Sequence, residues 1–348
     1  MTILITQKKR LNQMAFVMLI LVFFVIGLGA YTRLSHSGLG CPDWPGCYGF
    51  LSVPDKTDEL ALANIRYPEQ EVEYKKGAIE MIHRYIAGLA LLGAFGLLAM
   101  TLVEKKKTGQ SRYLFHAIAI VFIIVLQAAF GMWTVTLKLW PQIVTAHLLG
   151  GFTTLSLVYL LWLRTRSSFL VPDSFIVSIK HIRLIFVAFL IVLGQIFLGG
   201  WMAANYAAFA CPDLPVCQGS IWPNADFAQA FNLIQHIGPT YLGGLLEGEA
   251  RVAIHMSHRI GAIFTVLAVS LLGFYMLNKH KKLAYRLFFI LGVQVMLGLA
   301  NVWLQIPIWV AVAHNLIAAL LLITMVEVLY LFLKMKITQK KEEGYDVI

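Results

Sequence analysis

Hydrophobic residues form eight long runs along the chain, separated by polar stretches. Crossing a hydrocarbon core takes about 20 helical residues. The runs predict transmembrane helices at residues 13–34, 78–103, 113–138, 142–163, 182–204, 252–277, 284–305 and 308–333. With 59% hydrophobic and 13% charged residues, the chain cannot hide its apolar surface in one soluble core. The sequence therefore predicts an all-α integral membrane protein.

Lysine and arginine mark one side of the predicted bundle. They gather at the N-terminus, at residues 105–112, 164–183 and 279–286, and after residue 333. By the positive-inside rule this side is cytoplasmic, so we expect a bacterial inner membrane protein with both termini in the cytoplasm. Two long loops, about 35–77 and 205–250, lie on the other side. The net charge of +10 is then a topology signal, and no basic stripe points to nucleic acid.

The chain also repeats itself after about 170 residues. The repeated elements are Cys41-Pro-Asp-Trp-Pro-Gly-Cys47 with Cys211-Pro-Asp-Leu-Pro-Val-Cys217, His83-Arg84 with His258-Arg259, and His147 with His314. Self-similarity at a fixed offset indicates internal duplication. We expect two tandem four-helix bundles, an N-terminal half at 1–166 and a C-terminal half at 181–348, joined by a cytoplasmic linker at 167–180.

All four cysteines fall in the two long loops, as Cys41 with Cys47 and Cys211 with Cys217. Each pair closes a short loop in a compartment that is oxidising in bacteria, so we expect two disulfides. A disulfide of this kind either shapes the loop over the helix ends or acts as a reducible, redox-active pair, and both interpretations stay open. Zinc is a poor alternative, because neither pair has a second pair of ligands nearby.

Four histidines lie inside predicted helices at repeat-matched positions: His83 and His147 in the first half, and His258 and His314 in the second. A titratable ring within a membrane helix is costly and is a functional hypothesis by default. Two imidazoles from facing helices at one depth can hold the iron of a haem from both faces. Hydrogen bonding between helices is the simpler alternative. The matched recurrence favours haem ligation, with one site in each half.

The residue three positions before the ligand differs between the halves. Glu80 precedes His83, whereas His255 precedes His258, and residues three apart share one helix face. A buried carboxyl beside an iron site can transfer a proton to or from a reacting group. The alternative is a structural acid neutralised by Arg84. The asymmetry indicates that the two halves do different things.

Arginines and glutamines complete the repeated neighbourhood. Arg84 and Arg259 directly follow candidate ligands, and their guanidinium groups suit pairing with haem propionates; the alternative is snorkelling to the membrane interface. Gln127 and Gln294 match across the repeat, and we expect them to form hydrogen bonds between helices.

These residues resemble the haem A synthase family over essentially the whole chain. The resemblance rests on the run Gly29–Cys47, on Glu80-x-x-His83-Arg84, and on His147, His258-Arg259 and His314 in a plan of four plus four helices. It implies a membrane oxidoreductase that oxidises the methyl group at carbon 8 of haem o to a formyl group by successive hydroxylations. It also implies haem b on His258 and His314, the substrate iron at His83 and His147, and Glu80 serving the oxidation.

The resemblance further implies partners. These are haem o and haem A, a membrane or protein electron donor, and, as neighbouring proteins, haem o synthase and terminal oxidase assembly factors. No dinucleotide-binding fingerprint is present, which agrees with an external donor. Two other classes stay open: a quinol-linked dihaem b-type electron-transfer cytochrome, which has no use for Glu80, and a transporter, where duplicated halves are common. The oligomeric state is undetermined by the sequence.

Overall fold

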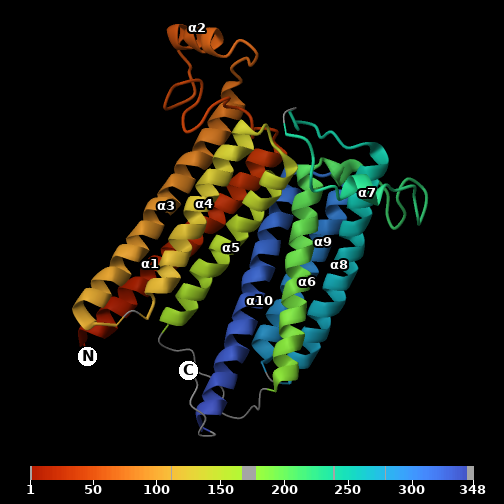
Figure 1. The fold of residues 1–348 in the computed structure, drawn as a ribbon. Helices are drawn as coiled ribbons and strands as arrows, with labels where there is room; N and C mark the ends of the chain where they lie inside the picture. Colours follow the sequence, from red (N-terminus) through yellow and green to blue (C-terminus); the bar gives the residue numbers. More distant parts are fainter. Residues whose placement is uncertain (1, 111, 167–177, 238–239, 279, 343–348) are drawn as a thin grey trace.

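The protein is a bundle of long helices with two loop regions at one end (Figure 1). This computed structural model describes residues 2–110, 112–166, 178–237, 240–278 and 280–342. Within these ranges, 8 helices are long and apolar enough to cross a membrane, judged by length and composition. The same ranges contain no β-sheet, only isolated bridges between Cys47 and Phe50 and between Cys217 and Ser220. The expected all-helical, eight-span membrane protein is confirmed.

The long helices form two sets of four in chain order. The first set is α1 (Thr2–Leu34), α3 (Tyr74–Thr108), α4 (Leu114–Thr136) and α5 (Pro141–Thr165), and the second is α6 (Ile179–Ala204), α8 (Gly248–Leu277), α9 (Lys281–Trp303) and α10 (Ile308–Glu342). Several extend past the predicted runs, because polar ends such as the lysines of α3 continue the helix beyond its apolar segment.

Three short helices lie in the loops and were absent from the sequence prediction: α2 (Thr57–Arg66), the 3-10 helix η1 (Ala207–Phe209) and α7 (Phe227–Ala230). The helix α2 has acidic residues in its first turn and Arg66 in its last, which complements the helix dipole. It lies away from the bundle, at the tip of the first loop (Figure 1).

The four helices of each set pack as a closed ring. In the first set α1 and α4 each contact α3 and α5, and in the second set α6 and α9 each contact α8 and α10. The sets meet along a seam, which we define as the contacts of α1 with α10, α5 with α6, and α5 with α10. If α1 is exchanged with α6 and α5 with α10, the same three contacts result. An interface with two-fold symmetry has this property.

Backbone conformation repeats in the same way. The non-glycine residues with positive φ, which range from 47° to 64°, occupy repeat-matched positions: His36 and Tyr206, Tyr48 and Gln218, Lys138 and Gln305, and Leu139 and Ile306. Side chains other than glycine seldom adopt this left-handed region. The matched pairs support an internal duplication, which stays a prediction together with the half boundaries. Residues 167–177 of the expected linker lie outside the described residues, and Ile179 and Lys180 belong to α6.

The helix α10 lies at the centre of the molecule. Half of its most apolar segment (50%) is buried, against 17–33% for the other seven long helices. It contacts α1 and α5 of the first set in addition to its own neighbours, and the apolar core runs without interruption through both sets. The other helices expose apolar faces along their length, as membrane lipid requires.

Close packing of α8 on α9 yields a test of the fold. A Cβ built on Gly273 would lie 2.7 Å from the ring of Phe288. We expect Gly273→Val to lower the free energy of unfolding by about 1–3 kcal/mol through overpacking, measured as a lower thermal denaturation midpoint in detergent. Gly88→Val on α3 is the control, because nothing lies within 4 Å of a Cβ built on Gly88. Equal midpoints for the two variants would contradict the packing described.

Candidate functional site

The four repeat-matched histidines lie near the loop end, meaning the end of the bundle that carries the loops at 35–73 and 205–247 (Figure 1). His83 and His258 lie in about the first three turns of α3 and α8, and His147 and His314 in about the first two turns of α5 and α10. His83 and His147 are within electrostatic range of each other, as are His258 and His314. The structure therefore brings together one histidine pair in each half.

Each histidine ring packs against a glycine of a neighbouring helix. A Cβ built on these glycines would lie 3.0–3.5 Å from the Cε1 atom of the ring: Gly29 of α1 beside His83, Gly131 of α4 beside His147, Gly199 of α6 beside His258, and Gly298 of α9 beside His314. At Gly29, Gly199 and Gly298 the distance is 3.0–3.2 Å, so a side chain there would crowd the ring, whereas a Cβ on Gly131 would make an ordinary contact. We call each set of two glycines a cradle, and the two cradles match across the repeat.

Three of the four histidines have a ring nitrogen without a hydrogen-bond partner within the described structure. Nδ1 of His83, His147 and His314 is buried and makes no hydrogen bond within the described structure. Buried polar atoms are nearly always paired, and an unpaired one calls for an explanation such as a bound ion. Imidazole nitrogens are axial ligands of haem iron. The donor set and the cradles thus fit a haem held from two sides in each half.

Glutamines lie beside the histidines of the second half. Gln195 of α6 donates from Nε2 to the backbone oxygen of His258 at 3.0 Å, and the same atom lies 3.1 Å from Nδ1 of that ring. Nε2 of Gln294 lies 3.2 Å from Nε2 of His314, across α9 and α10. Gln127, the match of Gln294, lies beside His147 in the first half. Its own Nε2 makes no hydrogen bond within the described structure, so its expected role stays a prediction.

Glu80 connects α3 to the first loop. Its residue is 4% exposed, Oε2 accepts a hydrogen bond from the backbone N–H of Cys41 at 3.0 Å, and Oε1 pairs with the guanidinium of Arg84. Arg84 also donates to loop carbonyl oxygens, among them that of Asp43. The acid therefore lies between the disulfide loop and His83, one turn further along α3.

In the second half, α8 is also connected to its loop, but through different side chains. Arg259 donates to three backbone oxygens of the second loop, including that of Cys211. Nδ1 of His255, the counterpart of Glu80, lies 3.2 Å from the backbone oxygen of Ala207. Both candidate propionate-binding arginines, Arg84 and Arg259, thus hold loops onto helices in this structure, and their pairing with propionates stays a prediction.

The two expected disulfides are present: Cys41–Cys47 and Cys211–Cys217. An aspartate shapes each loop that they close. Asp213 accepts hydrogen bonds from the backbone N–H groups of Gln218 and Gly219 at 2.8 Å each, and Asp43 makes the equivalent bonds in the first loop. The bond from Gly219 is the main reason that the pKa of the Asp213 carboxyl lies below its ordinary value. Whether either disulfide is redox-active stays open.

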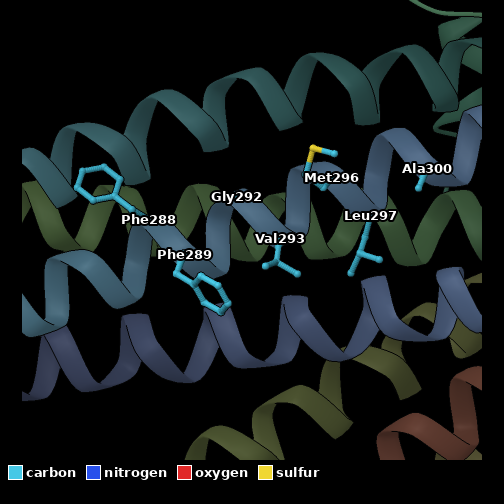
Figure 2. Close-up of a pocket in the computed structure, with 7 residues that line it drawn as sticks. All are labelled: Phe288, Phe289, Gly292, Val293, Met296, Leu297 and Ala300. Atoms are coloured by element: carbon cyan, nitrogen blue, oxygen red, sulfur yellow. The ribbon is translucent and has the colours of Figure 1, made fainter.

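One groove lies away from the histidines, on the outer face of α9 (Figure 2). It is lined by Phe288, Phe289, Gly292, Val293, Met296, Leu297 and Ala300. None of these side chains titrates, and Phe289 and Met296 are 71% and 60% exposed. We therefore interpret it as a lipid-facing depression over Gly292 and assign it no chemistry.

A comparison of the two halves in sequence does not identify some of the polar residues near the histidine pairs. Gln195 has Val25 as its counterpart, and Arg33, which lies at the loop end of α1, has Ala203. A repeat reveals only what both copies keep, so these residues leave no signal. The cradle glycines do recur, and an alignment of the halves around the histidines could have identified them.

The fold and the site define a multi-pass helical membrane protein whose halves each hold a pair of partly buried histidines at the end of the bundle that carries a disulfide-closed loop. The chain belongs to the family of cytochrome oxidase assembly proteins (COX15-CtaA), whose model matches residues 12–326. That match spans both sets of helices, so the family shares the whole bundle.

Similar proteins in three bacteria carry one name. The chain is 44% identical over 315 residues to the heme A synthase of Shewanella oneidensis, which covers 90% of this chain and 93% of the relative. It is 24% identical over 326 residues to that of Erythrobacter litoralis and 26% identical over 319 residues to that of Wolbachia pipientis subsp. Culex pipiens; each match covers 87% of this chain and 91% of the relative.

A side chain placed in a cradle tests whether the cradle holds a haem. A Cβ built on Gly298 would lie 3.2 Å from the ring of His314, so Gly298→Val should displace the ring and reduce the haem that copurifies with the protein. Soret absorbance per mole of protein measures the loss. Gly292→Val on the same helix is the control, because nothing lies within 4 Å of a Cβ there. Equal haem content in both variants would rule out this cradle.

Proposed function

We propose that this protein converts haem o to haem A, oxidising the methyl group at carbon 8 to a formyl group by successive hydroxylations. Membership of the family and the name shared by the relatives support this assignment. The observation that carries it is the recurrence, once in each half, of a histidine pair beside a glycine cradle, with a buried, unpartnered Nδ1 on His83, His147 and His314. Unequal surroundings of the two pairs suit an enzyme that retains one haem and reacts another.

In this proposal His258 and His314 hold haem b. Gln195 and Gln294 lie against these two histidines, and polar partners of this kind orient imidazole ligands and keep a cofactor in place. Haem b, when bound, supplies one-electron redox chemistry. The second half contributes the cradle, the two ligands and their glutamine partners.

His83 and His147 bind the iron of the substrate haem o in the same proposal. Val25 occupies the position that corresponds to Gln195, so the first half lacks the counterpart of the glutamine that lies against His258. A ligand without an orienting partner holds a metal less tightly. Weaker ligation suits a molecule that must leave as product, whereas the cofactor has to stay.

Glu80 is the proposed acid–base group. The hydrogen bond from Cys41 and the ion pair with Arg84 fix the orientation of its carboxylate, and a positioned carboxyl can move a proton at a reacting group. The same contacts also fasten the first loop to α3, which is the structural interpretation. A substitution that keeps the shape of the side chain and removes its charge separates the two roles.

The proposed setting is a bacterial inner membrane, with both termini in the cytoplasm and the loop end on the periplasmic side. The lysine-rich and arginine-rich segments at the opposite end support this orientation, and the two disulfides suit an oxidising compartment. A membrane or protein electron donor supplies the electrons. Haem o synthase and terminal oxidase assembly factors are the proposed neighbours.

A dihaem electron-transfer cytochrome is not favoured. The family and the relatives point to haem A formation. The halves also differ at the position three residues before the first histidine of each pair, where Glu80 is 4% exposed and so is His255. A protein that only passed electrons between two equal haems would have no need for a buried acid at one of them.

Replacing a proposed haem b ligand should remove the retained cofactor. We expect His258→Ala or His314→Ala to abolish the tightly held haem b spectrum, because the iron loses an axial ligand. Absorbance spectra and pyridine haemochrome analysis of the purified variants measure this. His236→Ala, in the exposed part of the second loop, is the control. An unchanged spectrum in a variant would remove that histidine as a ligand.

Glu80→Gln should leave haem b in place and reduce haem A formation by about 10²- to 10⁴-fold, the usual contribution of an acid–base group. Chromatography and mass analysis of haems extracted from cells measure the product. Glu104→Gln is the control, because Glu104 is another buried acid near the far end of the same helix. Normal haem A in the Glu80→Gln variant would show that Glu80 is structural.

A further inference from the structure

An arginine at the loop end of α1 reaches across to the other half of the molecule. Nη2 of Arg33 donates to the backbone oxygens of Ala203 at 2.7 Å and Ala204 at 3.4 Å, at the last turn of α6. The guanidinium carbon lies 4.0 Å from the ring centre of Tyr206. Nε is buried and has no partner within the described structure. The charged group is thus enclosed and only partly satisfied.

No acidic side chain neutralises this charge. The ion pairs within the described residues involve Lys56, Lys76, Arg84 and Arg286, and Arg33 is not among them. Carbonyl dipoles at a helix C-terminus and an aromatic face stabilise a cation, but they offset only part of the cost of burying it without a counter-ion. A cation held in this way favours an anionic ligand.

The other arginines beside the histidine pairs have acids of their own. Arg84 pairs with Glu80. Arg259 lies within electrostatic range of Asp213 and donates to three loop oxygens. Arg33 is therefore better suited than these two to bind an anion from outside the chain.

Arg33 lies close to the first-half site along the helix axis. Gly29, which packs against the ring of His83, precedes Arg33 by four residues, so the two share one face of α1 with a rise of about 6 Å between them. Because Arg33 is further toward the loop end, it lies above the edge of the cradle and not within it. Its repeat counterpart is Ala203, so the second half has no equivalent cation.

A second buried polar group lies on the same side of α6. Thr145 of α5 is 3% exposed, and its Oγ1 has no hydrogen-bond partner within the described structure. Its methyl group would lie 3.5 Å from a Cβ built on Gly200, one turn below the carbonyls that bind Arg33. Thr145 also precedes His147 by two residues. Two unsatisfied donors thus lie on consecutive turns between α6 and the first-half histidine pair.

We propose that Arg33, assisted by Thr145, binds a propionate carboxylate of the porphyrin held by His83 and His147. The inference rests on the proposed function and deepens it. A guanidinium N–H donates a strong, charge-assisted hydrogen bond to a carboxylate, and Nε of Arg33 is the donor left without a partner within the described structure. The methyl group at carbon 8 shares a pyrrole ring with one propionate, so holding that carboxylate also positions the methyl group. Arg33 is thereby a residue that determines which edge of the substrate is presented for oxidation.

Esterified porphyrin tests this recognition directly. The full-length protein, its C-terminal site already loaded with haem, is titrated with hemin and with hemin dimethyl ester, in which both carboxylates are blocked. We expect hemin to bind about ten- to a hundred-fold more tightly than the ester, as expected for a hydrogen bond to a charged group. Arg33→Gln should abolish this preference by weakening hemin binding alone, and Arg33→Lys should keep part of it.

The control variant is Arg251→Gln, because Arg251 also lies at the loop end and donates to loop carbonyl oxygens, those of Leu246 and Gly244. It should keep the full preference for hemin. Equal loss of affinity for hemin and ester in Arg33→Gln would mean that Arg33 only fastens α1 to α6, and would overturn the proposal. Equal binding of hemin and ester by the wild-type protein would overturn it as well.

Two further readouts separate this inference from the function on which it rests. His83→Ala should remove the bis-histidine spectrum of the added hemin; a spectrum independent of His83 would overturn both the proposed site and the role of Arg33. Release of the C-terminal haem from Arg33→Gln, with titration of the first half unchanged, would assign the carboxylate to haem b and overturn the first-half assignment. Both readouts are independent of the comparison between hemin and its ester, so failure of the proposed site and failure of the role of Arg33 can be told apart.

Discussion

Polar and charged groups inside an apolar bundle must find partners, and the loop end of this molecule is organised by that requirement. Glu80 accepts a hydrogen bond from the backbone N–H of Cys41 and forms an ion pair with Arg84, while Arg259 donates hydrogen bonds to loop carbonyl oxygens. The loops therefore complete the hydrogen bonding of α3 and α8 as well as connecting helices. Nδ1 of His83, His147 and His314 has no such partner within the described structure, which is why the proposed function assigns these histidines to a bound haem.

The repeated framework and the chemistry depend on different residues. Glycines beside the histidines, left-handed residues near helix ends and in the loops, and the two disulfides recur in both halves, and they set where the rings and loops lie. The halves diverge at Glu80 and His255, at Val25 and Gln195, and at Arg33 and Ala203. In the proposed function these differences concern proton transfer, ligand orientation and charge, so a common framework would support two unlike sites.

Features set by residues close together in the sequence could be predicted, whereas features that depend on tertiary contacts could not. The eight long helices and the disulfides were predictable, because run length and cysteine spacing are local properties. The helix α2 was not, since it is polar and lies in a loop outside the apolar pattern. The contacts of Arg84 and Arg259 with loop carbonyls depend on tertiary folding. Arg33 and Gln195 were missed because they differ from their repeat counterparts.

The seam brings the two unlike sites close together through small residues. Gly199 packs against the ring of His258, and a Cβ built on the adjacent Gly200 would meet Leu148 at 3.4 Å. Leu148 directly follows His147 in α5, so a short series of packed residues leads from one histidine pair to the other. Because bulkier residues on α6 would hold α5 further away, the glycines let the two halves pack closely at the seam. In the proposed function, this closeness would shorten the path for electrons between a haem held by His258 and His314 and the substrate haem, and the difference between the two sites would give that transfer its direction.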